Sequence, residues 1–464
     1  MTQSRSISGA RTKNSPKQAN RAALSAFLGG ALEYYDFILF ASAAAIIFPR
    51  VFFPDAESSN LLSFATFGVA YLARPIGAIV IGHLGDKFGR KNALLLTLLL
   101  MGLATFIIGC LPSYEQIGGL ASLLLVAMRL LQGFSAGGEI AGASSLSIEH
   151  APAGRRAFYG SWTIQGVGAG TLLASIVMLP VMKLPDELLF SWGWRIPFLA
   201  SLVVLLLTYF VRRTVDEPEI FTEAKETGKT AKLPLLEAFK TSWANIIRVV
   251  LMTLHFIPDS VIAVFGAAYA ISMGMDRTTV VVSTIVTNLV ALAIRPIAGT
   301  LADRIGRKPV FFVGAIGSGA SIFAYFAAID SGSTLLFFLA QAMTVGLFVA
   351  CCGAIYPAFY AEMFNARTRY SGMAISLQFG SVIAGFAPTL GTILAPGSPD
   401  GWMPIAALTA IALLIAALAT LSARETFKTP LHALGYSQKE LAVNHGRQPA
   451  GSTTTIADSE NVQP

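Results

Sequence analysis

Twelve apolar runs, each about as long as a bilayer is thick, alternate with polar loops along this sequence. An α-helix needs roughly 20 apolar residues to cross the hydrocarbon core, where every backbone amide must be bonded within the helix. Only 13% of the 464 residues are charged, about half the usual roughly 25%. We therefore predict an all-α polytopic membrane protein. The predicted spans are residues 22–48, 61–82, 92–111, 119–148, 157–180, 195–211, 249–271, 279–302, 309–329, 333–361, 370–395 and 401–423.

A short polar loop occurs twice, each time between two apolar runs. Residues 82–91 read GHLGDKFGRK, and residues 299–308 read GTLADRIGRK, so both follow the pattern G-x3-D-[KR]-x-G-R-K. The glycines allow tight turns that a Cβ atom would obstruct. Because both copies occupy corresponding places, they indicate an internally duplicated membrane protein.

A second set of polar residues repeats at a fixed offset. Glu149, Arg156 and Gln165 stand at the same mutual spacing as three residues found 213 positions later, which are Glu362, Arg369 and Gln378. An even number of spans returns the chain to its starting face. We therefore predict two like-oriented, pseudo-symmetric bundles of six helices each.

The basic residues predict the orientation. Of the 33 Lys and Arg residues, 26 lie in the two terminal tails, the central loop and the other loops on their side. The positive-inside rule then places both termini and the central loop in the cytoplasm. The net charge of +7 thus comes mostly from the basic residues that set the orientation in the membrane, and we expect no nucleic-acid partner. The predicted parts are a cytoplasmic tail (1–21), a first bundle (22–211), a cytoplasmic central loop (212–248), a second bundle (249–423) and a mostly disordered cytoplasmic tail (424–464).

Several motifs resemble those of a known family. The two Gly-Asp loops, and the Arg129-x-x-Gln132-Gly133 motif, resemble signatures of the major facilitator superfamily. The segments 33–37 (EYYDF), 74–77 (RPIG), 137–139 (GGE) and 191–198 (SWGWRIPF) resemble its metabolite:proton symporter family, whose permeases carry shikimate, oxoglutarate, citrate, proline or betaine. The resemblance covers residues 20–423. It implies the twelve-helix major facilitator fold and secondary transport.

Charged and amide side chains in the first and fourth spans are the leading candidates for the transport site. Glu33 and Asp36 project from one side of their predicted helix, as do Arg129, Gln132 and Glu139. Charge inside a bilayer costs at least about 2.5–3.5 kcal/mol per residue, so these groups need partners or water. If the two faces meet, Arg129 can balance a carboxylate for which a proton or a substrate competes. The alternative is a static ion pair that fixes helix register.

The seventh span offers a second candidate proton site. His255 and Asp259 are four residues apart, with Pro258 loosening the helix between them. The alternative is a histidine bonded to a neighbour. Further candidates for the cavity, any of which could instead be structural, are Tyr34, Tyr35, Arg74, Gln165, Asn288, Arg295, Gln341, Tyr356 and Gln378.

The duplicated loops are candidates for a gate. Arg90 can reach Glu149, Arg307 can reach Glu362, and the loop aspartates can cap neighbouring helices. The family resemblance implies that these contacts latch the cytoplasmic side shut, and the alternative is that the charges only set orientation. The predicted gate residues are Gly82, Asp86, Gly89, Arg90, Glu149, Asp303, Gly306, Arg307 and Glu362.

Taken with the resemblance, these features predict a proton-driven symporter of a small organic anion, a carboxylic acid such as shikimate, in a bacterial-type inner membrane. The nearest alternative is a symporter of a zwitterionic osmolyte such as proline or betaine. A drug exporter, a non-transporting sensor and a membrane-embedded enzyme are weaker alternatives, the last because no nucleophile-base pair or metal spacing is present. The predicted partners are the lipid bilayer and a small-molecule substrate. We expect a monomer with protons as the coupling ion, and with neither cofactor nor metal.

Overall fold

A computed structural model describes residues 16–54, 59–217, 222, 234–394 and 401–435. Within these residues the chain is helical and contains no strand, which confirms the predicted all-α class. Eleven of the helical stretches are long and apolar enough to cross a membrane. The twelfth span, α18, is not among these eleven, and most of its first half is buried inside the protein.

Within the described residues, the first half of the chain forms six long helices with four short ones between them. The long helices are α1 (Pro16–Ile46), α3 (Ser59–Phe88), α4 (Arg90–Cys110), α6 (Gly119–His150), α7 (Arg156–Val181) and α9 (Arg195–Arg213). The short ones are α2 (Phe48–Phe52), α5 (Tyr114–Ile117), α8 (Asp186–Leu188) and η1 (Leu189–Gly193).

The second half repeats this order, but two of its spans are interrupted. The seventh span runs through α11 (Pro234–Met252), η2 (Thr253–Phe256), α12 (Ile257–Val261), η3 (Ile262–Gly266) and α13 (Ala267–Ser272). The tenth span runs through α16 (Thr334–Gln341), η4 (Ala342–Val349) and α17 (Ala350–Glu362). The other elements are α14 (Arg277–Ile305), α15 (Arg307–Asp330), α18 (Arg369–Leu394), α19 (Met403–Ser422) and η5 (Leu431–Ala433).

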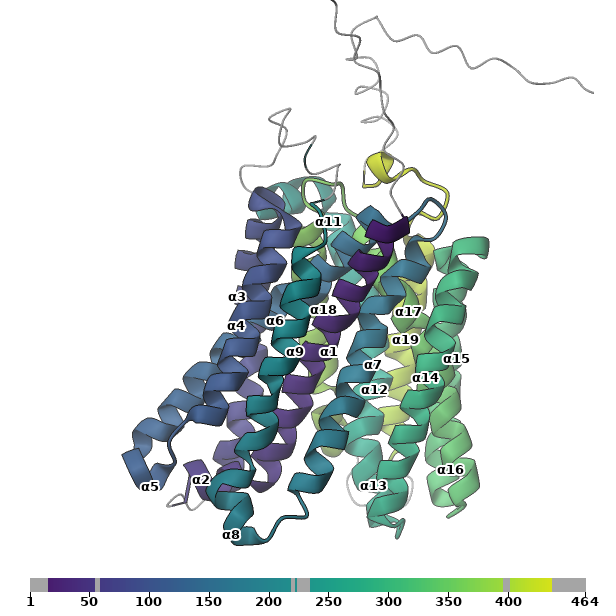
Figure 1. The fold of residues 1–464 in the computed structure, drawn as a ribbon. Helices are drawn as coiled ribbons and strands as arrows, with labels where there is room; N and C mark the ends of the chain where they lie inside the picture. The colour runs from purple at the N-terminus through teal and green to yellow at the C-terminus, as the bar shows by residue number, and fades with distance from the viewer. Residues whose placement is uncertain (1–15, 55–58, 218–221, 223–233, 395–400, 436–464) are drawn as a thin grey trace, which may run out of the picture.

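The two halves form two bundles that meet along a few helices. In Figure 1 the purple and blue helices of the first half stand beside the green and yellow helices of the second. Across the interface, α7 contacts α14 and α17, while α18 contacts α3 and α6. The described helices therefore confirm the predicted arrangement of twelve spans in two six-helix bundles.

Both chain ends of the described part lie on one face of the molecule, at the top of Figure 1. We call it the loop face, because it also carries the two Gly-Asp loops and the start of α11. The opposite face carries α2, α5, α8, α13 and α16.

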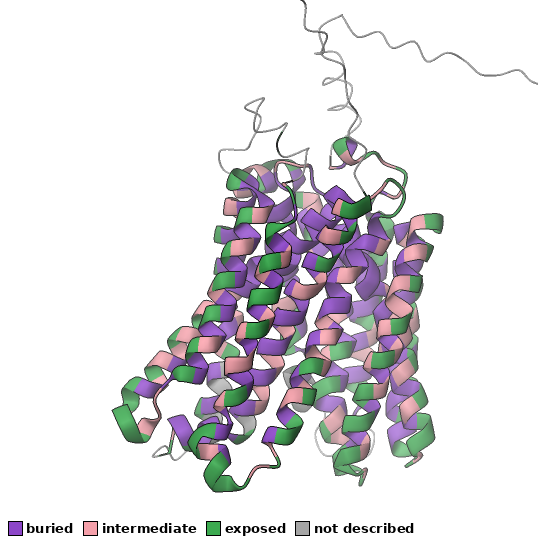
Figure 2. Ribbon diagram, viewed as in Figure 1, coloured by how far each residue is buried: buried purple, intermediate pink, exposed green. Residues whose placement is uncertain are grey.

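The outer surface of the bundles is apolar. Figure 2 shows exposed residues along the outer sides of the helices and buried residues between them. Leu72 is 74% exposed and Val203 is 70% exposed, although each lies in the middle of a span. Such side chains face lipid, which is as apolar as they are. Besides the apolar residues that form its core, the interior contains many buried polar and charged side chains.

Two glycines of the duplicated loops have backbone angles that other residues rarely adopt. Gly89 has a φ of 113° and Gly306 a φ of 109°, and each directly precedes the helix that follows its loop. A Cβ atom is strained at such angles. The repeated glycine in G-R-K therefore fixes the turn into α4 and into α15.

The segment after α19 differs from the prediction. Residues 424–435, which we call the strap, pack across the loop face, and Leu434 is only 1% exposed. The prediction of a mostly disordered tail is thus wrong for the strap, because its polar residues bond to the bundles. The rest of that predicted tail, and most of the predicted N-terminal tail, lie outside the described residues.

Candidate functional site

A chain of hydrogen bonds links the leading acid and base inside the first bundle. Arg129 Nη1 donates to Gln132 Oε1 (3.1 Å), and Gln132 Nε2 donates to Thr105 Oγ1 (2.6 Å). Thr105 Oγ1 in turn donates to Asp36 Oδ2 (2.5 Å). Asp36 and Arg129 are each only 2% exposed. The described contacts therefore join acid and base through two neutral side chains, and Thr105 is a member that the sequence analysis missed.

A small cavity lies against this chain. It has a volume of about 10 Å³ and is lined by Asp36 and Arg129, together with Glu33 and Arg74. That is room for about one water molecule. Asp36 Oδ1 is buried without a hydrogen-bond partner among the described residues, so such a water has an acceptor there.

Glu33 and Arg74 form a second acid-base pair beside the cavity. Arg74 Nη2 lies 3.6 Å from Glu33 Oε1. The ring of Phe37 lies between the two arginines, 5.2 Å from the guanidinium of Arg74 and 5.3 Å from that of Arg129. Four helices, α1, α3, α4 and α6, thus supply the cluster, and all belong to the first bundle.

Glu139 lies in a separate ion pair outside this cavity. Both of its oxygens accept hydrogen bonds from Arg212, and Oε2 also accepts from Thr97 Oγ1 (2.6 Å). Arg212, at the end of α9, was not predicted, because nothing in its local sequence marks it as buried. The pair connects α6 to α9 and α4, which suits a structural role.

A second group of polar residues lies where the two bundles meet. Arg295 of α14 donates to the carbonyl of Ile164 in α7 (3.0 Å) and interacts electrostatically with Asp259, Tyr356 and Tyr34. Asp259 is exposed although it sits in the middle of a span and faces Arg295. A charged side chain that is accessible at this depth indicates that it borders a water-filled space.

Two glutamines also cross between the bundles. Gln165 Nε2 donates to the carbonyl of Leu292 (2.7 Å), and Gln378 Nε2 donates to the carbonyl of Gly137 (3.3 Å). The Oε1 atom of each glutamine is buried without a partner among the described residues. These carbonyl groups can therefore accept hydrogen bonds from a ligand or from water.

The remaining predicted cavity residues are placed elsewhere. Tyr35 donates to the carbonyl of Pro197 (2.7 Å) inside the first bundle. Asn288 donates to the carbonyl of Thr284 (3.1 Å) one turn earlier, and Gln341 accepts from Ser283 (2.8 Å) inside the second bundle.

His255 packs away from Asp259. The 3₁₀ turn η2 directs His255 into a ring of aromatic side chains, where its Nδ1 lies 2.9 Å from the carbonyl of Met252 and 3.2 Å from Tyr360 Oη. No described contact joins His255 to Asp259, because the helix is not regular between them.

The first Gly-Asp loop reaches across to the second bundle. The backbone N–H groups of Tyr370 and Ser371, in the first turn of α18, donate to the Asp86 carboxylate at 3.2 and 2.8 Å. Arg90 Nε lies 3.0 Å from Glu149 Oε2, and Arg369 Nη1 of the second bundle lies 2.5 Å from Glu149 Oε1. Glu149 is therefore shared by one arginine from each bundle.

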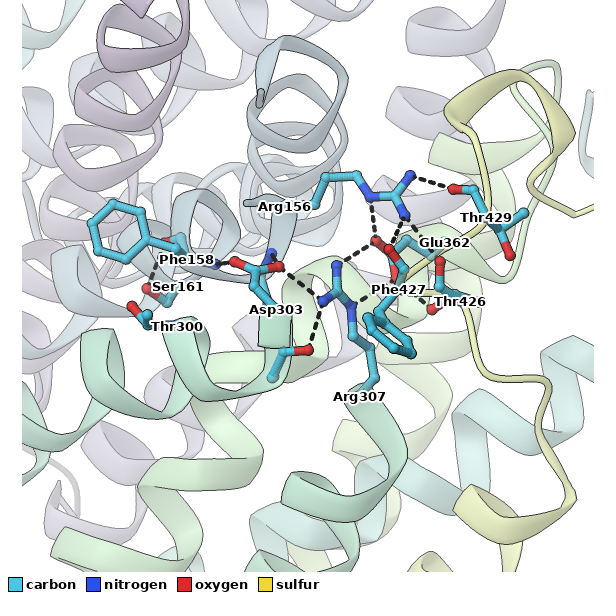
Figure 3. A network of polar contacts seen from close by, with 12 residues as sticks. Arg156, Phe158, Ser161, Thr300, Asp303, Arg307, Glu362, Thr426, Phe427 and Thr429 are labelled. Atoms are coloured by element: carbon cyan, nitrogen blue, oxygen red, sulfur yellow. Dashed lines mark hydrogen bonds and ion pairs between the residues drawn. The ribbon is translucent and has the colours of Figure 1, made fainter. Parts of the chain in front are cut away.

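The second Gly-Asp loop repeats these contacts in the opposite direction. Figure 3 shows Asp303 accepting from the backbone N–H groups of Ala157 and Phe158 (both 2.9 Å), in the first turn of α7. Glu362 lies 3.0 Å from Arg307 of its own bundle and 2.8 Å from Arg156 of the other. We call the two sets of contacts the latches. Both crossing arginines, Arg156 and Arg369, belong to the sequence repeat with the 213-residue offset. Only the structure shows that each of them binds the glutamate of the other bundle.

Two further acids complete the latches and were not predicted. Glu217 accepts from the backbone N–H groups of Arg90 (2.5 Å) and Lys91 (3.2 Å), and Glu425 accepts from those of Arg307 and Lys308 (both 3.0 Å). Each acid thus caps the helix that follows a Gly-Asp loop. Burial raises the pKa of the Glu217 carboxyl, against the opposing effect of these N–H donors.

The polar contacts between the bundles that are given above share one side of the molecule. They lie in the loop-face half of the helices, the deepest being those of Gln165, Gln378 and Arg295. The structure is therefore closed at the loop face.

Comparisons with known proteins agree with this architecture. A family model described as "Sugar (and other) transporter" matches residues 22–241, and one described as "Major Facilitator Superfamily" matches residues 250–443. The chain is 36% identical to the shikimate transporter of Escherichia coli, over 88% of this chain and 95% of that protein. It is 31% identical to the proline/betaine transporter of Salmonella typhimurium, over 89% of this chain and 84% of that protein.

Solved structures share the fold. The proton:xylose symporter XylE bound to 6-bromo-6-deoxy-D-glucose superposes with a TM-score of 0.72 at 18% identity, covering 92% of this chain and 99% of that one. The inward-open conformation of the xylose transporter XylE from E. coli gives a TM-score of 0.60, covering 89% of this chain and 98% of that one.

Proposed function

The chain belongs to the major facilitator superfamily of membrane transporters, and from that premise we propose that it carries a small organic anion, a carboxylic acid, together with protons. The observation that carries this proposal is the acid-base chain from Asp36 to Arg129 beside a cavity with room for one water. A buried acid that can bind a proton, linked to a base, is the minimum that proton coupling needs.

Proton coupling suits an anionic substrate for an electrostatic reason. Moving one negative charge into a compartment that is 100 mV negative costs about 2.3 kcal/mol. One proton carried with each carboxylate removes that cost. In the proposed cycle, a proton on Asp36 cancels its charge and weakens the bond from Thr105, which alters the link to Arg129 on α6.

The proposed substrate position lies between the bundles and not within the first one. Arg295 reaches across the interface to Ile164, whereas Arg129 bonds Gln132 and Arg74 pairs with Glu33, both residues of the first bundle. The free carbonyl groups of Gln165 and Gln378 can accept from hydroxyl groups of a substrate. A hydroxylated cyclic acid of the shikimate type fits these groups, and the related shikimate transporter supports that choice.

The proposed cycle is alternating access. The protein then lies in the inner membrane as a monomer, and its loop face is in the cytoplasm. The excess of Lys and Arg on the loop face supports this orientation. The latches are then the cytoplasmic gate, and they open when the bundles rock about the Arg295 region. No resident metal or cofactor enters this cycle.

A zwitterionic osmolyte is the second candidate substrate. The similarity to a proline/betaine transporter favours it, and so do the rings of Phe37 and Tyr71, which already lie against one cation, the guanidinium of Arg74. The acid Glu33 can supply the opposite charge.

Uptake into proteoliposomes with an imposed pH gradient separates the two candidates. We expect a labelled hydroxylated cyclic acid to accumulate more strongly as the outside is made more acidic. Other carboxylates should compete, and excess betaine should not. Accumulation of proline or betaine that carboxylates fail to inhibit would instead establish the second candidate.

Arg295→Gln should weaken substrate binding specifically. A hydrogen bond between charged partners contributes about 1.5–3 kcal/mol, so we expect KM for the carboxylate to rise roughly 10- to 150-fold. Initial uptake rates over a range of substrate concentrations measure this change. Arg295→Lys keeps the positive charge but loses the planar guanidinium that can bind both carboxylate oxygens. Its KM should therefore lie between those of the wild type and Arg295→Gln.

The control for this variant is Arg277→Gln, an exposed position at the start of the same helix, which should leave KM unchanged. An unchanged KM in Arg295→Gln would remove Arg295 from the substrate site.

A further inference from the structure

A second cavity, of about 310 Å³, opens at the loop face away from both proposed transport sites. Its walls are α11 from Thr241 to Arg248, the end of α17, and the strap from Arg424 to Gly435. A cavity of this size is within the range of small-ligand sites. Neither the Asp36 cluster nor Arg295 borders it, so neither proposed transport site accounts for it.

The lining of this cavity favours an anion. Arg248 and Arg424 both border it. The described contacts of Arg248 are neutral, to Asn245 Oδ1 (2.8 Å) and to Ser422 Oγ (3.3 Å), so its charge is not balanced by a described acid. Among the described lining residues the acid is Glu362, which is already balanced by Arg307 and Arg156 at 3.0 and 2.8 Å.

The cavity also borders the lipid-facing side of α11. Trp243 and Ile247 of α11 lie one turn apart, beyond the kink at Ser242, and are 61% and 49% exposed, so they form a short apolar stripe. Trp243 belongs to this stripe and also lines the cavity, and indole rings concentrate where the bilayer meets water. Leu236 and Phe239 are also exposed, but they lie before the kink at Ser242 and do not belong to this stripe.

We propose that this cavity binds the headgroup of an anionic phospholipid, with the phosphate at Arg248 and Arg424 and the acyl chains along the stripe. Basic pockets between spans on the cytoplasmic side of a membrane have the charge that such headgroups need. A soluble anion gains nothing from the exposed indole and the apolar stripe. The geometry therefore favours a lipid over a free phosphate.

A lipid in this cavity stabilises the closed state, because one wall of the cavity is part of a latch. Thr426 of the strap donates to Glu362 Oε2 (2.5 Å), and Arg156 of the other bundle donates to the carbonyls of Thr426 (2.9 Å) and Thr429 (3.0 Å). A headgroup that holds Arg424 and Arg248 together fixes the strap in this position.

The test measures lipid binding to the purified full-length protein in detergent. Native mass spectrometry and thermal unfolding are recorded with phosphatidylglycerol and with phosphatidylcholine of the same acyl chains. We expect phosphatidylglycerol alone to be retained and to raise Tm. Each arginine should contribute roughly fivefold to the affinity, so Arg248→Gln should lower it about fivefold and the double variant with Arg424→Gln about 25-fold.

Lys428→Gln is the matched control, because Lys428 is an exposed basic residue of the strap that does not line the cavity. Equal retention of phosphatidylglycerol by the wild type and Arg248→Gln would overturn the proposal. So would an equal rise in Tm with glycerol phosphate, which lacks acyl chains. If the double variant does not fold, the single variant Arg248→Gln is sufficient for the test. Neither native mass spectrometry nor thermal unfolding depends on transport, so the result is independent of the proposed substrate.

Discussion

Asp36→Asn should abolish the accumulation of substrate that a pH gradient drives, while exchange of labelled for unlabelled substrate continues. An amide cannot take up the coupling proton, but its oxygen can still accept the hydrogen bond from Thr105 Oγ1, so the helix packing is kept. The other carboxylate oxygen of Asp36 has no described partner to lose. The change therefore removes a protonation step without removing a structural contact.

The size of the effect follows from the driving force. A gradient of one pH unit supplies about 1.4 kcal/mol per proton, which supports a roughly tenfold accumulation ratio for a one-to-one symporter. The wild type should approach that ratio in proteoliposomes, and Asp36→Asn should remain near one. Counterflow exchange in the same vesicles shows whether the variant is folded and binds substrate.

Glu33→Gln is the informative comparison, since Glu33 borders the same cavity but pairs with Arg74. Coupling at Asp36 predicts that Glu33→Gln still accumulates substrate. Normal accumulation by Asp36→Asn, together with its loss in Glu33→Gln, would move the coupling acid to Glu33.

The second large effect concerns the latches. The double variant Asp86→Asn/Asp303→Asn should open the loop face. Each aspartate uses both oxygens to accept from the first turn of a helix in the other bundle, and an amide turns an NH₂ group toward one of those donors. We expect a loss of about 2–3 kcal/mol at each site, from a charged hydrogen bond and the helix dipole.

A loss of about 4–6 kcal/mol at two sites is enough to reverse a two-state equilibrium that favours the closed state a hundredfold. Spin labels at Lys87 and Arg304, exposed positions of the two loops, report the separation of the bundles. The distance distribution should move to longer values in the double variant and partly in each single variant. The background lacks the three cysteines, Cys110, Cys351 and Cys352.

Asp276→Asn is the control, because Asp276 caps α14 within one bundle on the opposite face. The distances between the spin labels in this variant should match those in the spin-labelled protein without it. A double latch variant with unchanged distances would show that the loop face is held by packing alone.

The sequence was sufficient for the fold because each span has to satisfy the membrane locally. A run of apolar residues is visible without knowledge of its neighbours, and the two copies of G-x3-D-[KR]-x-G-R-K revealed the duplication. The exceptions are spans whose helices break. Pro258 was recognised as a loosening element, but the 3₁₀ turn that turns His255 away from Asp259 depends on the aromatic neighbours that receive the ring.

The candidate site was predicted less completely, because partners in it come from distant parts of the chain. The sequence selected Asp36 and Arg129, but Thr105, which lies between them, is an ordinary threonine in an apolar run. Glu139 was assigned to the transport site because it shares one side of its helix with Arg129, whereas its actual partner Arg212 begins the predicted central loop. The functional roles of these residues remain predictions until the variants are measured.

The exchange of arginines between the latches bears on how the chain arose. Arg369 bonds Glu149 and Arg156 bonds Glu362, so neither half can complete a latch from its own residues. A single-half ancestor with the same motif could close only by pairing with a second copy, and such a pairing is isologous, each copy giving what it receives. The two halves of this chain thus complete each other's latch as two identical copies would, each supplying one arginine and receiving one.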